Sequence, residues 1–171
     1  MHFVHIANTH ALRWGAVAAA AALAADQASK ALLLYGFNFR DMVPGDHIPV
    51  LPFFDLVMVW NRGISYGLFQ SQGLSGTLLL TLFSLGAIAA LTWWLTRTER
   101  AFPAIGLGLV IGGALGNVID RIMYGAVADF FHFHAFGRDW YVFNIADAAI
   151  SVGVVALLAD AFRRPKPGVK P

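Results

Sequence analysis

Cysteine is absent from this 171-residue chain, which excludes thiol nucleophiles, disulfides and thiolate metal sites together. Glutamate is nearly absent too, because nine of the ten acidic residues are aspartates and the exception is Glu99. The zinc-protease pattern HExxH does not occur, and His132 and His134 have a spacing that would point them apart on a helix. We therefore expect no metal and no other cofactor, and any hydrolytic chemistry must use aspartate, serine or lysine.

Charged residues make up only 13% of the chain, against 58% hydrophobic residues. Together with a mean hydropathy of +0.63, this composition is typical of an integral membrane protein. The formal net charge of +2 is too small to indicate a nucleic-acid surface. From the hydrophobic composition we expect membrane lipids around the protein. The length suits a single membrane domain covering residues 1–171.

Four apolar stretches are long enough to cross a bilayer, which takes about 20 helical residues. They cover residues 12–35, 73–95, 102–119 and 143–162. An alternative for the first stretch is a cleaved signal peptide ending near Ala22-Leu23-Ala24. Because apolar residues resume at Ala31, one long span explains the pattern more simply. The sequence therefore predicts four transmembrane helices.

The segment at residues 36–72 contains three prolines and is expected outside the membrane. Aromatic and β-branched residues at 53–60 predict a strand there, and a second strand at 140–143 is expected to pair with it. The basic, proline-rich tail at residues 163–171 is expected to be disordered.

Positive charge predicts the orientation of these spans. An even number of spans places both termini on one side, and seven arginines and lysines fall on that side against four on the other. The seven are Arg13, Arg97, Arg100, Arg163, Arg164, Lys166 and Lys170, and the four are Arg40, Arg62, Arg121 and Arg138. The expected location is a bacterial inner membrane with both termini in the cytoplasm.

Polar residues from three predicted helices fall at the same depth, near the outer face of the membrane. Helical spacing groups them into the patches Asp26 with Lys30, Asn117 with Asp120 and Arg121, and Asn144 with Asp147. Such groups are costly in a membrane and indicate a functional site. A small channel or transporter remains an alternative, although a conduit needs polar residues along its whole length.

Glycines recur every four residues in the third predicted span, at Gly108, Gly112 and Gly116. Small residues at this spacing allow membrane helices to approach closely. We therefore expect the third span to be central in the bundle.

Three kinds of peptide hydrolysis are open to these residues. The tetrapeptide at residues 73–76 matches the GxSG of rhomboid-type serine proteases, but the fourth span has no histidine to act as base. Ser29 and Lys30 could form a dyad, although neighbours on a helix point about 100° apart. A pair of aspartates sharing one proton could activate a water without a covalent intermediate. The candidates for this pair are Asp129 and Asp147.

Five sequence blocks resemble, in the same order, those of lipoprotein signal peptidase, also called signal peptidase II. They are DQASK (26–30), NRGISYG (61–67), GGALGNVIDR (112–121), VADF (127–130) and FNIAD (143–147). The resemblance implies an aspartyl endopeptidase that removes the signal peptide of diacylglyceryl-modified prolipoproteins just before the lipidated cysteine. It also implies a mainly α-helical membrane fold with a small periplasmic β-sheet and a short periplasmic helix over the site. We expect a monomer.

The same resemblance implies roles for individual residues. Asp129 and Asp147 match the catalytic dyad. The positions that bind substrate or order the dyad are Asn61, Gly63, Asn117, Arg121 and Asn144, and those of structural polar support are Asp26, Lys30 and Asp120. Ser65-Tyr66 departs mildly from the commoner Ala-Phe.

Simpler interpretations stay open for several of these residues. Asp26 and Lys30 suit an intrahelical ion pair, and Asp120 and Arg121 suit an interfacial helix end. Asn144 could simply cap the fourth helix. Without the resemblance, Asp129 would be a solvated loop carboxylate. The remaining expectations are Asp160 at the surface, and His132 and His134 in a loop or at the membrane interface.

Overall fold

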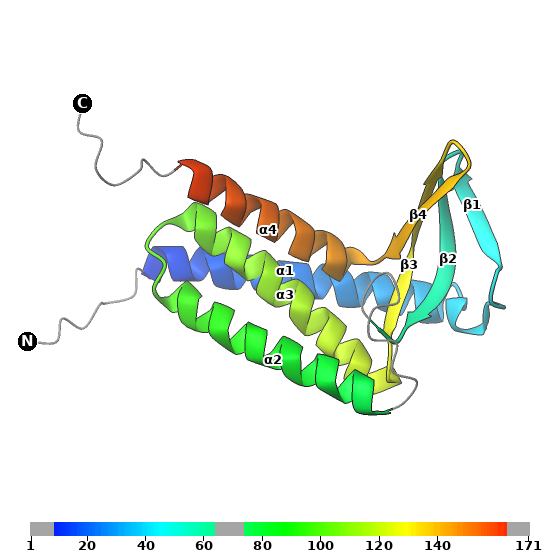
Figure 1. Cartoon of the computed structure of the whole chain (residues 1–171), viewed down its shortest axis with the longest axis horizontal. Helices are drawn as coiled ribbons and strands as arrows, with labels where there is room; N and C mark the ends of the chain where they lie inside the picture. The colour runs from blue at the N-terminus through cyan, green and yellow to red at the C-terminus, as the bar shows by residue number, and fades with distance from the viewer. Residues whose placement is uncertain (1–8, 64–73, 164–171) are drawn as a thin grey trace, which may run out of the picture.

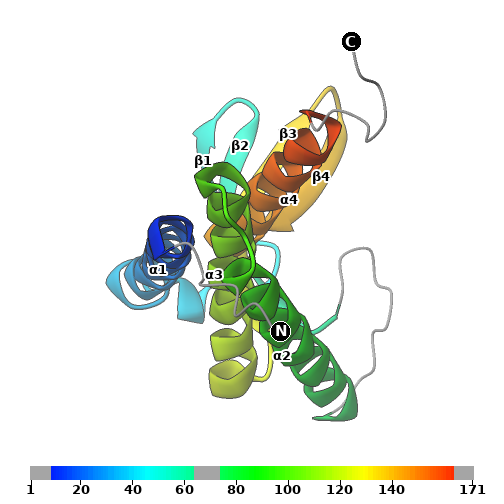
Figure 2. The ribbon, with the colours of Figure 1, turned by 90° about the vertical axis from the view of Figure 1, so that its left-hand side faces the viewer.

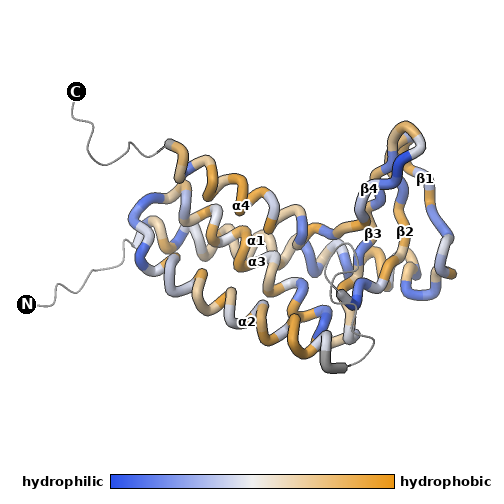
Figure 3. The backbone as a smooth tube through the Cα atoms, viewed as in Figure 1, coloured by the Kyte–Doolittle hydropathy of each residue, from blue (hydrophilic) through white to orange (hydrophobic). Residues whose placement is uncertain are grey.

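Four long helices and one four-stranded sheet make up the computed structural model, which describes residues 9–63 and 74–163 (Figure 1). The helices are α1 (Thr9–Ala31), α2 (Leu74–Thr96), α3 (Ala101–Tyr124) and α4 (Ile145–Arg163). Each is long and apolar enough to cross a membrane, and Figure 3 shows the apolar residues running along them. The predicted four-helix membrane fold is confirmed.

Helix α3 is the centre of the bundle and packs against α1, α2 and α4 (Figure 2). Its contact with α1 depends on glycine, because a Cβ atom at Gly108 or Gly112 would collide with the backbone carbonyl of Gly15 or Ala19. Backbones can approach this closely only where side chains are missing. The predicted central position of the third span is therefore confirmed.

The sheet lies at one end of the bundle, and the described ends of the chain lie at the other (Figure 1). Its strands are β1 (His47–Leu51), β2 (Phe54–Asn61), β3 (Val127–Ala135) and β4 (Arg138–Phe143), antiparallel and in that order. The expectation that residues 140–143 pair with 53–60 is wrong. Strand β3 separates them and pairs with both β2 and β4.

A two-residue hairpin explains how β4 comes to pair with β3. Phe136 and Gly137 have positive φ values of 53° and 71°, and Ala135 pairs with Arg138 across the turn. Two residues of this conformation match the right-handed twist of the flanking strands. Glycine tolerates it at no steric cost, so the sequence AFGR encodes the turn.

The sheet is fixed to the bundle by a small apolar core. Leu33 and Leu34, in the π-helical turn Leu32–Gly36 that extends α1, pack with Phe39, Ala128 and Phe130. Phe39 begins a one-turn 3₁₀ helix, Phe39–Asp41, in the predicted extramembrane segment. Three parts of the sequence analysis concern residues outside the described ranges. They are most of the block at residues 61–67, Gly73 of the GxSG match, and the tail from residue 164.

Candidate active site

Asp129 lies in β3 and is almost completely buried, with 1% of its surface exposed. Its Oδ1 accepts a hydrogen bond from Asn144 Nδ2 at 2.7 Å, and its Oδ2 accepts one from Asn61 Nδ2 at 3.0 Å. Asn61 is itself oriented, because the Gly63 amide donates to its Oδ1 at 3.1 Å. The alternative of a solvated loop carboxylate at residue 129, which applied only without the family resemblance, is therefore wrong.

Asp147 lies in the first turn of α4 and is partly buried. Its Oδ1 accepts a hydrogen bond from Asn117 Nδ2 at 2.9 Å. Its Oδ2 accepts from the Asn144 backbone amide at 3.3 Å, while the Asp147 amide donates to Asn144 Oδ1 at 2.9 Å. This reciprocal exchange is a capping box, so Asn144 caps the helix as well as contacting Asp129.

Asn144 therefore joins the two candidate aspartates. Its side-chain amide donates to Asp129, and its side-chain carbonyl and backbone amide hold Asp147. Burial and the charge of Asp147 raise the pKa of Asp129 from its ordinary 3.8 to about 7, against the opposing effect of the hydrogen bonds from Asn61 and Asn144. The structure thus brings Asp129 and Asp147 into one polar network.

A buried ion cluster lies directly behind this network. Lys30 Nζ is 2.8 Å from Asp26 Oδ2 and 2.7 Å from Asp120 Oδ2, and all three side chains are at most 3% exposed. The intrahelical pair of Asp26 with Lys30 is as predicted. The alternative of an interfacial Asp120 is wrong, because that carboxylate points inward to the lysine.

The ion cluster holds the backbone on both sides of the candidate dyad. Asp120 Oδ2 accepts the amide of Ala128 at 3.1 Å, and Asp26 Oδ1 accepts the amide of Ala146 at 2.9 Å. Ala128 precedes Asp129 in sequence, and Ala146 precedes Asp147. Each aspartate is therefore anchored through its neighbour, which fixes the relative position of β3 and α4.

Asn117 connects the ion cluster to the dyad. Its Oδ1 accepts hydrogen bonds from Lys30 Nζ at 3.5 Å and from Asn144 Nδ2 at 3.3 Å, while its Nδ2 binds Asp147. Because its carbonyl faces donors, its amide must turn to the carboxylate.

Gln27 belongs to this site although residue-by-residue reasoning did not single it out. Its Nε2 lies 3.1 Å from Asp26 Oδ2 and 3.3 Å from Asp120 Oδ1, so it ties together the two carboxylates that Lys30 neutralises. Its place inside the block at residues 26–30 was the available signal. The contacts of the Ala128 and Ala146 backbone amides could not be predicted from sequence, because every residue other than proline has a backbone amide.

Arg121 lies beside the network but in the described residues it makes no ion pair with either candidate aspartate. Its Nη1 donates to the backbone carbonyl of Asn117 at 3.3 Å, and its side chain lines a cavity between α2 and α3. The predicted role in binding substrate is compatible with this position.

Of the two positions expected for His132 and His134, the loop is wrong, and the membrane interface stays a prediction. Both histidines lie on one face of β3, where His134 is 3.1 Å from Asp55 and His132 is 3.5 Å from Asp139. In the described ranges no three histidine, aspartate or glutamate side chains are placed to hold a metal ion.

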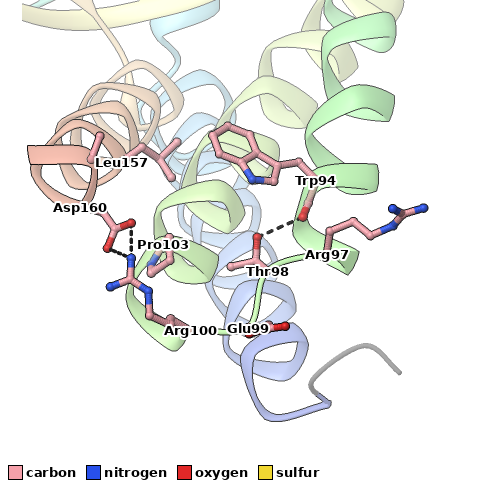
Figure 4. A pocket seen from close by; sticks show the side chains of 9 residues that line it. Trp94, Arg97, Thr98, Glu99, Arg100, Pro103, Leu157 and Asp160 are labelled. Carbon is pink, nitrogen blue, oxygen red and sulfur yellow. Dashed lines mark hydrogen bonds and ion pairs between the residues drawn. The ribbon is translucent and has the colours of Figure 1, made fainter. Parts of the chain in front are cut away.

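Asp160 is not at the surface as expected. It lies at the opposite end of the bundle, is 4% exposed, and both its carboxylate oxygens accept from Arg100 Nη2 (Figure 4). The salt bridge lines a cavity of about 380 Å³, in which Asp160 is paired with Arg100 and not with a second carboxyl. This cavity is far from the candidate dyad and offers no comparable chemistry.

Comparison with known proteins gives consistent matches over most of the chain. Residues 18–163 match the family model described as "Signal peptidase (SPase) II". A "Lipoprotein signal peptidase" of Rhodopseudomonas palustris (strain TIE-1) is 53% identical over 154 residues, which cover 88% of this chain and 92% of that protein. One from Methylorubrum extorquens (strain PA1) is 52% identical, covering 90% and 88%.

The fold also matches solved structures. One is described as "Bacterial membrane enzyme structure by the in meso method at 2.3 A resolution", with a TM-score of 0.73 and 27% identity over 91% of this chain and 94% of that one. A second, described in the same words but at 1.9 A, gives a TM-score of 0.75 and 25% identity over 88% and 94%.

Proposed function

This chain belongs to the signal peptidase II family, and from that premise we propose which of its residues cut the substrate and how they do so. Members of the family are membrane proteases of the aspartic type, and the function of this chain is to cleave signal peptides from prolipoproteins. The catalytic residues we propose are Asp129 and Asp147.

In the active state the pair holds one proton, which we assign to Asp129. Burial favours the neutral form of this carboxyl, and its pKa of about 7 leaves it largely protonated in slightly acidic conditions and about half protonated at neutral pH. Asp147 is then the carboxylate, held by the side-chain amide of Asn117 and the backbone amide of Asn144. The two groups thus begin as acid and base.

Hydrolysis follows from these two states. Asp147 takes a proton from a water as the water oxygen attacks the scissile carbonyl carbon, and Asp129 gives its proton to the carbonyl oxygen. When the resulting diol collapses, the C–N bond breaks and the leaving amine takes the proton held by Asp147. The hydroxyl that becomes the new carbonyl returns its proton to Asp129, so both residues end as they began.

The observation that carries this proposal is the double contact of Asn144 with Asp129 and Asp147. A single asparagine that binds both carboxylates fixes their separation and orientation, as general acid–base catalysis requires. Asn61, Asn117 and the ion cluster of Asp26, Lys30 and Asp120 support it. This is why we assign Asn61, Gly63, Asn117 and Asn144 to ordering the dyad.

Arg121 is proposed as a substrate-binding residue. A guanidinium has five N–H donors, and Arg121 uses one of them for the Asn117 carbonyl, so it can also donate to substrate carbonyls in the adjoining cavity.

The proposed location is the bacterial inner membrane, with both termini cytoplasmic and the sheet in the periplasm. The distribution of arginine and lysine supports this orientation. In it, the dyad lies at the periplasmic boundary, where the lipid-modified cysteine of a precursor emerges from the membrane. We propose a monomer acting on a diacylglyceryl-modified precursor.

A channel is not favoured. The buried polar network occupies one end of the bundle, whereas Ala11, Leu95, Ala104, Leu107 and Ile111 form an apolar core at the other. A conduit needs polar residues along its length.

The test is to incubate the purified protein with a diacylglyceryl-modified precursor and with the same precursor lacking the lipid. We expect cleavage before the modified cysteine in the first and none in the second, measured by mass spectrometry of the products. Equal cleavage of both precursors would contradict the lipid requirement, and cleavage of neither would contradict the peptidase assignment.

A further inference from the structure

A cavity of about 530 Å³ lies between α2 and α3 at the sheet end of the bundle. Thr77, Leu78 and Thr81 line it from the first turns of α2, and Arg121, Ile122, Tyr124 and Gly125 line it from the end of α3. Arg62, the residue that follows β2, also lines it. Because α2 begins and α3 ends here, the cavity lies at the ends of two candidate membrane spans.

Among the described residues, the charged groups that line this cavity are two guanidinium groups, Arg62 and Arg121, and no carboxylate lines it. The structure shows no ion pair for either guanidinium in the described residues. Asp120 and Arg121 are successive residues and point about 100° apart around α3. The buried carboxylates therefore act on Arg121 through their field, but they do not occupy the cavity.

The neutral polar groups of the lining are already bonded. Thr77 Oγ1 donates to the Gly125 carbonyl at 3.1 Å, Thr81 Oγ1 donates to the Thr77 carbonyl at 2.7 Å, and the Tyr124 hydroxyl bonds that of Tyr35 at 2.9 Å. The donors left for a ligand are therefore those of the two arginines. Such a pair binds a phosphate group in geometry that a single ammonium cannot match.

The walls of the cavity continue into apolar, outward-facing surface. Leu78 and Ile122 are 59% and 69% exposed, and Leu82, one turn further along α2, is 58% exposed. Acyl chains can lie along these residues while a phosphate contacts the arginines above them. Cationic groups at the end of the spans would bind the phosphate of a phospholipid, and the apolar surface next to them would contact its acyl chains.

The cavity at the opposite end of the bundle differs in charge. It also contains two arginines, Arg97 and Arg100, but Glu99 and Asp160 line it as well, and Asp160 is bonded to Arg100 (Figure 4). Its lining is therefore balanced. In the α2–α3 cavity, by contrast, Arg62 and Arg121 share the lining with no carboxylate from the part of the chain that the structure describes.

We propose that the cavity between α2 and α3 binds one anionic glycerophospholipid, with the phosphate held between Arg62 and Arg121. The ligand differs from the precursor, whose diacylglyceryl group carries no phosphate. The bound lipid lies against α2, which otherwise packs mainly on α3. The lipid would share Arg121 and this cavity with the proposed substrate contact, whereas the catalytic roles of Asp129 and Asp147 do not depend on it.

Native mass spectrometry of the delipidated full-length protein tests it, with phosphatidylglycerol as the probe. We expect one retained phosphatidylglycerol per protein, and Arg62→Gln to weaken retention about tenfold, as loss of a charge-assisted contact predicts. Arg62→Lys should recover part of the binding. The control is Arg138→Gln, which removes the same charge from exposed residue 138 of β4, outside the cavity, and should leave retention unchanged.

Two further probes identify the source of the phosphate. Diacylglycerol has the same chains without the phosphate and should not be retained, and inorganic phosphate should not displace the lipid. Equal retention by Arg62→Gln and the unmodified protein, retention of diacylglycerol, or displacement by inorganic phosphate would each overturn the proposal. Precursor cleavage by the unmodified protein, measured separately, keeps this result distinct from failure of the peptidase function.

Discussion

Among single residues, Asp129 is the one whose surroundings most change its chemistry. Its carboxyl is buried in β3 beside the charge of Asp147, and these two effects outweigh the hydrogen bonds from Asn61 and Asn144 that favour the charged form. The result is a pKa near 7 in place of 3.8. A carboxyl in this range can give up and recover a proton under physiological conditions.

This pKa predicts how activity depends on pH. The mechanism needs a protonated Asp129, so cleavage of a lipidated precursor should fall as pH rises through about 7. The measurement is kcat/KM between pH 5 and 9 in a detergent whose charge does not change over that range. A rate that stays level up to pH 9 would contradict the assignment of Asp129 as the acid.

Stability should follow the same titration. Because the folded pKa lies above the unfolded one, the proton on Asp129 stabilises the fold fully below 3.8, and this contribution is lost as pH rises to about 7. The shift corresponds to roughly 4 kcal/mol as an order of magnitude. The Asp129→Asn variant has no carboxyl at this position to titrate. Its thermal midpoint, minus that of the unmodified protein, should therefore be larger at pH 8 than at pH 5.

The residues that could be predicted from sequence are those whose type was unusual for their place. Asp26, Lys30, Asn117, Asn144 and Asp147 are polar groups within apolar helices, and the structure joins them in one network. The burial of Asp120 and of Asp160 could not be predicted. Each lies near a helix end, and its partner, Lys30 or Arg100, comes from another helix or a loop.

At the level of elements, the contact between α1 and α3 brings together the residues of the ion cluster. Asp26 and Lys30 come from α1, whereas Asn117 and Asp120 come from α3, so the ion cluster forms only if these helices pack closely. Gly108 lies against the Gly15 carbonyl of α1 and permits that approach. The spacing of glycines made this contact predictable.

Gly108→Ala should therefore destabilise the protein by about 1 to 3 kcal/mol, because the added methyl forces the helices apart. The matched control is Gly86→Ala in α2, where a Cβ atom meets nothing within 4 Å. That change should be neutral or slightly stabilising, since alanine favours a helix over glycine. Thermal unfolding in detergent measures both, and equal effects would show that the close contact of α1 and α3 is unimportant.

The sheet was only partly predictable. Enrichment in aromatic and β-branched residues predicted β2, but it does not predict β3, because the residues VADFFHFHA mix small, charged and histidine side chains. Pairing depends on contacts between distant segments, which local pattern does not report. The order β1-β2-β3-β4 therefore came from the structure alone.

In the whole molecule, the polar site and the sheet share one end, and the loop between α2 and α3 lies at the other (Figure 1). The four-span fold followed from composition and length, because a bilayer imposes both. The proposed orientation, with the sheet in the periplasm, rests on the distribution of positive charge and remains a prediction.

The absence of cysteine makes the orientation directly measurable. Asp139→Cys places a thiol on the sheet, where the native side chain is 83% exposed, and Glu99→Cys places one in the exposed α2–α3 loop. A membrane-impermeant maleimide added to spheroplasts, cells whose inner membrane is intact, should label the first and spare the second. The reverse pattern would place the sheet in the cytoplasm.

The central claim is that Asp129 and Asp147 act together as the catalytic pair. The most direct measurement is single-turnover cleavage of a diacylglyceryl-modified precursor by Asp129→Asn and by Asp147→Asn, with Asp139→Asn as an exposed control. We predict that each dyad variant, folded and in the membrane, loses at least about a thousandfold in rate while the control keeps full activity. Full processing by either dyad variant would contradict the account.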